Sequence, residues 1–257
     1  MLVSSSYVMG KSRPSQLLIA AFVVAAVAWS VTACEDARRD ILGTEKTLYS
    51  QHDEELIIRD FFQDRRGGFF LDVGCAWPIR NSTTYYLEKH LGWSGIGIDA
   101  LPDYGPWWKE QRPRSRFFQF IVTDHSGSIE TFYRGGWPGV SSTEKGRVLG
   151  GRKVRQHEMR VPTTTLNDLL EREGVESIDL LSMDIEGSEP KALSGFDIER
   201  YRPELVCIEA MPASREFFVE YFSSHGYQRI EPNLDGEIAN WYFRPVTGGA
   251  GPARDAR

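Results

Sequence analysis

The sequence predicts an α/β fold of the Rossmann-like type: a doubly wound, mostly parallel sheet with a terminal antiparallel hairpin. Short apolar runs alternate along the chain with segments of helical periodicity, which is typical of a parallel sheet covered by helices. Most of these runs end in an acidic residue, and glycines mark the joins. Near the end of the chain two strand-like runs, 227–230 and 241–243, follow each other without a helix between them and predict the hairpin.

Composition describes an ordinary globular protein. The 257 residues, 41% hydrophobic and 26% charged, suffice for one domain with appendages. The net charge is -6, and the acidic excess argues against a nucleic-acid partner. We therefore expect the basic cluster Arg112, Arg114 and Arg116 to form a solvated face. Three cysteines without a Cys/His spacing predict neither a disulfide framework nor a metal site.

Residues 1–34 are predicted to be a signal peptide or a membrane anchor. Lys11 and Arg13 precede an unbroken apolar run of thirteen residues, 17–29. The run is short for a spanning helix, and the following Val-Thr-Ala-Cys sequence resembles a bacterial lipobox that would be lipidated at Cys34. A lipoprotein, an uncleaved single-pass anchor and a buried core helix are the alternatives. Because basic residues also follow the segment, the side of the membrane stays open.

The remaining chain divides into a linker, 35–47, a globular domain, 48–245, and a disordered tail, 246–257. Ser50 is expected to open the first helix of the domain, which would pack on the sheet edge. A helix over 102–112, a strand over 116–122 and a mobile loop over 135–151 follow. Residues 154–162 predict an edge strand or hairpin arm, and Thr165 predicts the cap of another helix.

The first informative stretch runs from Phe69 to Leu101. Its opening apolar run contains Asp72 and stops at Gly74, as expected for a buried parallel strand. Asn81 and the serine after it can cap the helix that follows. The next strand ends in Asp99, and ligands of doubly wound sheets bind at the carboxyl ends of the strands, where an acid can hold both ribose hydroxyls.

The glycine pattern distinguishes two classes of nucleoside cofactor. A pyrophosphate-binding GxGxxG that began at Gly74 would require glycines at positions where this chain has Ala76 and Ile79. An NAD(P)-linked enzyme is therefore the weaker alternative. A cationic sulfonium ligand that carries a ribose instead favours acids at the strand ends.

Such acids recur later in the chain. Asp124 follows the third predicted strand, where it could either reach an adenine amino group or hydrogen-bond its own backbone in the turn. A second informative stretch, 177–195, predicts a buried strand that ends in Asp184, with Glu186 in the turn that precedes a helix. Asp184 could instead bond backbone amides at the start of that helix. Glu209 ends a fifth predicted strand.

Together the two stretches resemble the FkbM-type methyltransferase family. Its motifs are matched here by FLDVGC at 70–75, by residues 81–99 and by IDLLSMDIEGSEPKALSG at 178–195. The resemblance implies the class I methyltransferase fold and S-adenosylmethionine (SAM) as the cofactor. It also implies O-methylation of a hydroxyl on a carbohydrate, a lipid or a secondary metabolite. A small-molecule, glycan or lipid acceptor is thus the expected partner.

By matching position, the resemblance places Asp72 and Gly74 at the methionine moiety of SAM, with Asn81 in the same cofactor-binding set. Asp99 would hold the ribose and Asp124 the adenine. Asp184 and Glu186 would be the catalytic pair at the site of methyl transfer. The bulky loop 76–80 departs from the family pattern, so a noncatalytic membrane-attached protein on the same fold is the other alternative.

Overall fold

The computed structural model describes residues 41–44, 46–135, 141–143, 145, 148–149, 152–153, 155–231 and 239–246. The chain divides into two units, residues 1–44 and 45–257. In the described part of the first unit, the Thr44 hydroxyl donates to the carbonyl oxygen of Ile41 over 2.9 Å.

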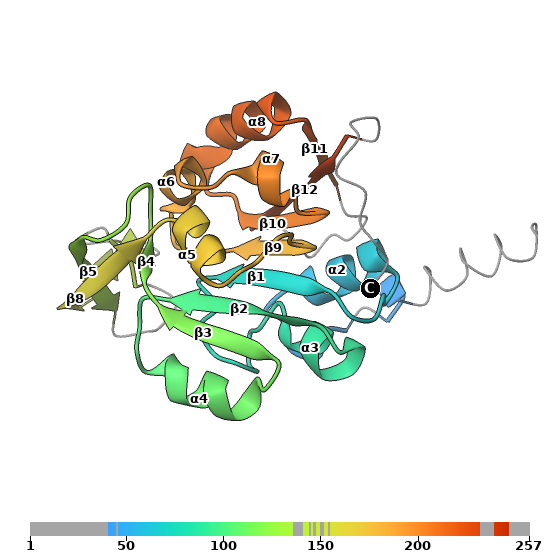
Figure 1. Cartoon of the computed structure of the whole chain (residues 1–257), viewed down its shortest axis with the longest axis horizontal. Coiled ribbons are helices and arrows are strands. Elements are labelled where there is room, and N and C mark those ends of the chain that lie inside the picture. Colours follow the sequence, from blue (N-terminus) through green and yellow to red (C-terminus); the bar gives the residue numbers. More distant parts are fainter. Residues whose placement is uncertain are drawn as a thin grey trace, which may run out of the picture. The chain divides into compact units, whose positions relative to one another are not determined.

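The second unit is built on a central sheet of seven strands (Figure 1). They are β1 (Phe69–Val73), β2 (Ser94–Asp99), β3 (Ser115–Gln119), β9 (Leu180–Met183), β10 (Leu205–Glu209), β11 (Tyr227–Ile230) and β12 (Asn240–Pro245). Their order across the sheet is β11–β12–β10–β9–β1–β2–β3. The five strands from β10 to β3 are parallel, whereas β12 pairs antiparallel with both β10 and β11. The predicted sheet and its terminal hairpin are confirmed.

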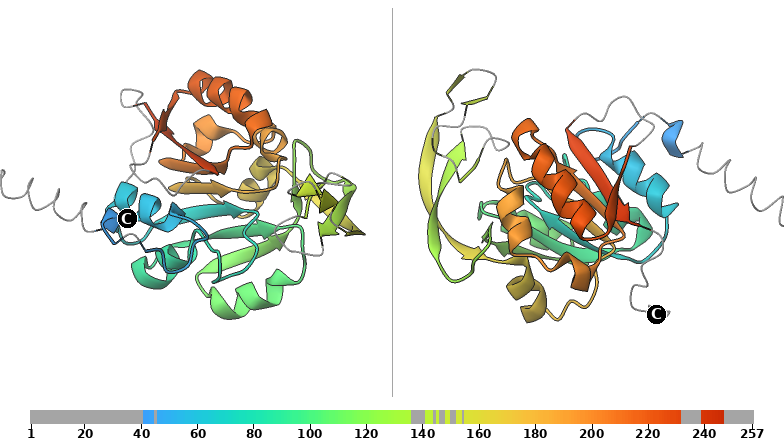
Figure 2. Two further views of the ribbon diagram at one scale, coloured as in Figure 1. Left: turned by 180° about the vertical axis from the view of Figure 1, so that it is seen from behind. Right: turned by 90° about the horizontal axis from the view of Figure 1, so that it is seen from above.

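Helices cover both faces of this sheet, as Figures 1 and 2 show. On one face α5 (Leu166–Arg172), α6 (Glu189–Ser194), α7 (Ile198–Tyr201) and α8 (Arg215–Ser224) pack on alternate strand residues. Leu71, Ile96 and Leu181 are fully buried in this larger core. Thr165 caps α5 as predicted, because its hydroxyl accepts a hydrogen bond from the backbone N–H of Asp168.

The opposite face carries α2 (Glu54–Phe62), α3 (Tyr85–Leu91) and α4 (Tyr104–Gln111). α2 packs its apolar residues on β1, β9 and β10 in the middle of the sheet, so the expected packing on the sheet edge is wrong. It also begins four residues after Ser50. The Ser50 hydroxyl accepts from the N–H of Glu55, one residue inside the helix.

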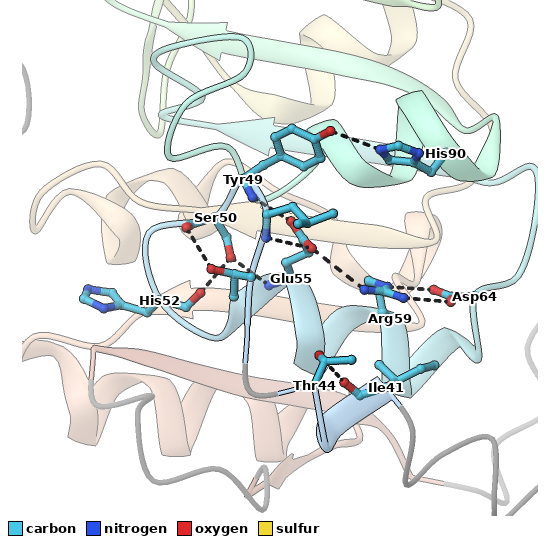
Figure 3. A network of polar contacts seen from close by, with 11 residues as sticks. Ile41, Thr44, Tyr49, Ser50, His52, Glu55, Arg59, Asp64 and His90 are labelled. Carbon is cyan, nitrogen blue, oxygen red and sulfur yellow. Dashed lines mark hydrogen bonds and ion pairs between the residues drawn. The ribbon is translucent and has the colours of Figure 1, made fainter.

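The segment before α2 is fixed by Glu55, as Figure 3 shows. This buried carboxylate accepts hydrogen bonds from the backbone N–H groups of Leu48 and Tyr49 over 3.2 and 2.9 Å. The Tyr49 hydroxyl contacts a ring nitrogen of His90 in α3 over 3.1 Å. These contacts hold the chain so that Gln51 and His52 line the cavity described below.

A smaller sheet lies beyond one end of the central strands, at the left of Figure 1. It contains β4 (Ile121–Val122), β8 (Gln156–Thr164) and β5 (Ile129–Gly135), with β8 in the middle. The single strand expected over 116–122 is thus two strands, which belong to different sheets. Residues 156–164 lie in the middle of the smaller sheet, so the edge alternative is wrong, whereas their antiparallel pairing with β5 agrees with a hairpin arm. β6 (Val148–Leu149), near the end of the expected mobile loop, pairs with β7 (Arg152–Lys153), which directly follows that loop.

No helix within the described ranges is long and apolar enough to cross a membrane. The predicted signal or anchor, 1–34, lies outside those ranges, as do all but the first residue of the predicted tail.

Candidate functional site

A cavity of about 660 Å³ opens at the carboxyl ends of β1, β2, β9 and β10. This is the edge of a doubly wound sheet at which ligands bind, and the volume suits a nucleoside-sized molecule. Its walls combine apolar and acidic side chains from the central sheet, the β1–α3 loop and the smaller sheet. The lining includes Gly74, Trp77, Arg80, Asn81, Asp99, Leu101, Tyr104, Ile121, Val122, Phe132, Ser141, Thr143, Asp184, Glu186 and Glu209.

The strand register explains why the acids gather on one face. Asp72 in β1 is registered with Gly97 in β2 and with Ser182 in β9. Because side chains alternate along a strand, Asp99 and Asp184, each two residues further on, face the same side as Asp72. Cys207 of β10 is registered with Ser182, so Glu209 follows the same rule. Spacing along the sequence alone does not show this alignment.

Asp99 is held by the backbone on both oxygens. Its Oδ2 accepts from the N–H of Ala76 over 3.1 Å, and its Oδ1 accepts from the N–H of Leu101 over 2.8 Å. Burial raises the pKa of Asp99 to about 6, against these two hydrogen bonds, which lower it. The carboxylate is therefore oriented before any ligand arrives, and it lines the cavity.

Asp72 does not line the cavity but lies behind it. The residue is 5% exposed and accepts a hydrogen bond of 2.6 Å from the Thr84 hydroxyl. Burial raises its pKa to about 6, while Thr84 and Arg112 oppose the shift. This buried acid thus fixes the start of α3.

Arg112 is the centre of that buried network, and the expectation that it belongs to a solvated face is wrong. Its side chain has no exposed surface and donates from Nε to Glu88 over 2.6 Å and from a terminal nitrogen to Thr84 over 3.0 Å. A further hydrogen bond of 3.0 Å reaches the carbonyl oxygen of Pro78. Burial with satisfied donors stabilises the β1–α3 loop, and Arg114 and Arg116 are the exposed members of the trio.

The β1–α3 loop is shaped by residues in the left-handed region. Gly74 has a φ of 82°, and Ala76 and Asn81 share positive φ values of 43° and 54°. Asn81 lines the cavity with an exposed side chain, and Ser82 alone of the predicted pair bonds α3, accepting from the N–H of Tyr85. Arg80 also lines the cavity and is the one arginine or lysine among the described lining residues.

Asp184 and Glu186 both line the cavity at the carboxyl end of β9. The N–H of Asp184 bonds the carbonyl oxygen of Val73 over 2.9 Å, which ties this strand end to β1. Glu186 has a φ of 61° in the tight turn that leads to α6. Glu189 bonds the backbone of this turn, because its Oε1 accepts from the N–H groups of Ile185 and Gly187 over 2.8 and 3.2 Å.

Asp124 is not among the residues that line the cavity. Its exposed carboxylate contacts the Thr123 hydroxyl over 3.2 Å and the Nδ1 of His125 over 2.7 Å. The hydrogen bond from His125 lowers the pKa of Asp124. Both contacts are to side chains of the same turn, and the neighbouring lining residues Ile121 and Val122 are apolar.

Sequence reasoning missed four groups at this site. Tyr104 is the first of them, and its ring packs edge-to-face on Trp77 of the bulky loop at the cavity wall, with the ring centroids 5.2 Å apart. Arg112 was not recognised because its basic neighbours indicated a solvated face. No motif or periodicity in the sequence indicated that Gln51 and His52 line the cavity. Glu189 did carry one, because it is the final acid of the quoted IEGSE motif.

A model of the methyltransferase FkbM domain matches residues 72–229. No curated protein matches the chain. Among solved structures, a TehB-like SAM-dependent methyltransferase from Corynebacterium glutamicum is 15% identical, with a TM-score of 0.43 and coverage of 81% of this chain and 94% of the other. For 1,6-didemethyltoxoflavin-N1-methyltransferase from Burkholderia thailandensis, crystallised with S-adenosylhomocysteine, the identity is 12%, the TM-score 0.38 and both coverages 93%.

Proposed function

The chain belongs to the FkbM family of SAM-dependent methyltransferases, and from this premise we propose that it transfers the methyl group of SAM to a hydroxyl of a carbohydrate, a lipid or a secondary metabolite. The observation that carries the proposal is the position of Asp99 and Asp184 at two strand ends on one acidic cavity. The combined negative charge of this wall favours a cationic sulfonium ligand, and neutralising one acid weakens that attraction only in part.

The cavity fits the parts of SAM. Asp99, already oriented by two backbone amides, can accept hydrogen bonds from both ribose hydroxyls. Apolar Leu101, Ile121 and Val122 offer a surface for adenine. Arg80 is a counter-ion for the methionine carboxylate, with Gly74 and Asn81 beside it, while Asp72 supports this loop from behind through Thr84. The adenine role of Asp124 stays a prediction.

SAM supplies an activated methyl carbon. In the proposed step the acceptor oxygen forms a bond to this carbon while the carbon–sulfur bond breaks, and the electron pair stays on sulfur. The hydroxyl proton passes to a carboxylate of this chain, for which Asp184 and Glu186 are placed. The main contribution of the protein is to align oxygen and carbon.

A pyrophosphate cofactor fits the same site poorly. The N–H of Ala76, in the loop that would cradle the phosphates, is already bonded to Asp99. Phosphate oxygens would also meet the carboxylates of Asp99 and Asp184, with Arg80 as their one cationic neighbour among the described lining residues. The NAD(P) alternative has no comparable support.

Titration calorimetry on the purified full-length chain tests the proposal. We expect SAM and S-adenosylhomocysteine to bind and NAD not to bind, and radiolabelled methyl groups to appear on hydroxyl-bearing acceptors. Binding of SAM without transfer to any acceptor class would favour the noncatalytic alternative. Preference for NAD would overturn the assignment.

A further inference from the structure

Three carboxylates meet at the carboxyl ends of β9 and β10. Asp184 follows β9, Glu209 ends β10 and Glu189 begins α6. One oxygen atom from each of them lies within 4.8 Å of the other two. Asp184 and Glu209 also line the cavity, so the cluster borders the site of the proposed chemistry.

One carboxylate oxygen of Glu189 has no hydrogen-bond partner within the part of the chain that the structure describes. The residue has no exposed surface, and its Oε1 accepts two backbone hydrogen bonds from the turn. Its Oε2 is buried with no hydrogen-bond partner among the described residues. Such an atom is rare in native proteins and marks a missing proton, ion or water. Burial raises the pKa of Glu189, and the nearby charge of Asp184 adds to the effect.

A cation would resolve both the repulsion and the unpaired oxygen. Three negative charges at such separations repel one another strongly in a partly buried site. Cations that prefer oxygen ligands bind at about 2.0–2.6 Å, so two ligand oxygens on opposite sides of one ion lie roughly 4–5 Å apart. The 4.8 Å limit on the oxygen separations is compatible with that spacing.

We propose that Asp184, Glu189 and Glu209 bind one divalent cation of the Mg²⁺, Mn²⁺ or Ca²⁺ class. The donor set is all oxygen, which disfavours zinc and copper. Asp184 and Glu209 contribute from the cavity side and Glu189 from the buried side, where its two backbone hydrogen bonds orient the carboxylate. This site goes beyond the sequence, which carries no recognised metal-ligand spacing.

The position of the ion gives it a use in catalysis, and this part rests on the proposed function. Three protein ligands leave coordination positions that face the cavity. An acceptor hydroxyl bound there would have a lowered pKa and would release its proton to a carboxylate or to water before the methyl group arrives. Acceptors with two neighbouring oxygens, such as vicinal diols or sugar rings, would chelate the ion and be preferred.

Cation binding is tested directly, without SAM, on the tag-free full-length chain stripped with a chelator. We expect Mn²⁺ to bind with one-to-one stoichiometry by calorimetry and to give an altered electron paramagnetic resonance spectrum. Glu209→Gln and Glu189→Gln should each lower the affinity for Mn²⁺ at least tenfold. The matched control is Glu216→Gln, an exposed acid in the first turn of α8, which should leave the affinity unchanged.

Glu189→Gln keeps an oxygen for the two backbone amides of the turn, so the variant tests the ion rather than the fold. Circular dichroism and thermal unfolding check that it folds, and if it does not, Glu209→Gln alone decides. Equal Mn²⁺ affinity in wild type and in the folded variants, or no binding at millimolar Mn²⁺, would overturn the proposal. A parallel SAM titration separates the two ideas, because SAM binding does not require the ion and ion binding does not require SAM.

Discussion

A Cβ atom on Gly74 would lie 1.7 Å from the backbone carbonyl oxygen of Asp184. The two residues belong to the two motifs that first indicated a cofactor site, and they sit on the adjacent strand ends β1 and β9. Their contact leaves no room for any side chain, so the first motif requires glycine here for a packing reason as well as for its φ of 82°.

Gly74→Ala is therefore expected to lower the free energy of unfolding by more than about 3 kcal/mol, since a backbone clash adds to strain in the left-handed region. Gly127→Ala is the matched control. Gly127 has a φ of 80° and nothing within 4 Å of its virtual Cβ, so it should cost only about 1–2 kcal/mol. Urea denaturation measures both. Equal costs would mean that the contact with Asp184 is relieved by a small shift.

The buried pair Arg112–Glu88 gives a second prediction. Arg112→Met should destabilise the protein by about 3–5 kcal/mol, because it leaves the carboxylate of Glu88 buried without its charged partner. The double variant Arg112→Met/Glu88→Gln should recover part of this loss, as seen in chemical denaturation. Arg114→Met, at an exposed position, is the control and should change little. A double variant less stable than the single one would contradict this account.

Much of the fold was predictable because it depends on local signals. Buried parallel strands are apolar runs whatever their neighbours are, and Gly92 ends α3 with a φ of 74°, as glycine commonly does at the end of a helix. The smaller sheet was not predictable in this way. In this sheet β8 (156–164) pairs with β4 (121–122) and with β5 (129–135), which lie far from it in the sequence. The sequence pattern of a strand does not show which distant strand it pairs with.

The site was predicted in part for the same reason. Strand ends place Asp99, Asp184 and Glu186 on the cavity, and those positions follow from the sequence pattern. Whether an acid faces the cavity or the protein interior depends on the packing around it. Asp72 is buried and bonded to the Thr84 hydroxyl, and Asp124 contacts the side chains of its chain neighbours Thr123 and His125. Only these three-dimensional contacts distinguish the two acids from Asp99.

Asp99 should make SAM binding depend on pH. Its pKa of about 6 lies above the ordinary aspartate value of 3.8, and ribose hydroxyls need the charged form as an acceptor. SAM affinity should thus be constant above about pH 7 and fall about tenfold for each pH unit below 6. Asp99→Ala should lower SAM affinity more than about tenfold at pH 7.5, because charge-assisted hydrogen bonds are lost. The same variant should also make SAM affinity nearly independent of pH.

Calorimetry between pH 5 and 8 measures this dependence. Asp72 also has a pKa of about 6, so Asp72→Asn serves to separate the two acids and should retain the slope. In the unliganded protein the raised pKa values of Asp72 and Asp99 affect folding stability in the opposite direction from SAM affinity. The folded state holds these protons more tightly, so stability falls as the pH rises from about 4 to about 6. Unchanged SAM affinity in folded Asp99→Ala would remove this residue from the site.

We also propose that the full-length chain is attached to a membrane through residues 1–34, on the basis of the apolar run 17–29 and Cys34. After a carbonate wash the protein should remain in the membrane fraction. Cys34→Ser should release it if lipidation is the anchor and leave it attached if the segment spans the bilayer. A chain of unprocessed mass in the soluble fraction would refute the proposal.

The last prediction concerns Asp184 and Glu186. Both line the cavity at the end of β9, whereas Glu189 makes the backbone hydrogen bonds that hold the turn. We expect Asp184→Asn and Glu186→Gln to fold and to bind SAM within a few-fold of wild type. At least one of them should lower turnover about a hundredfold or more, the scale of lost acid–base assistance. Glu216→Gln is again the control. Wild-type turnover in both variants on a true acceptor would exclude the catalytic pair, and unfolding of both would assign them to the turn.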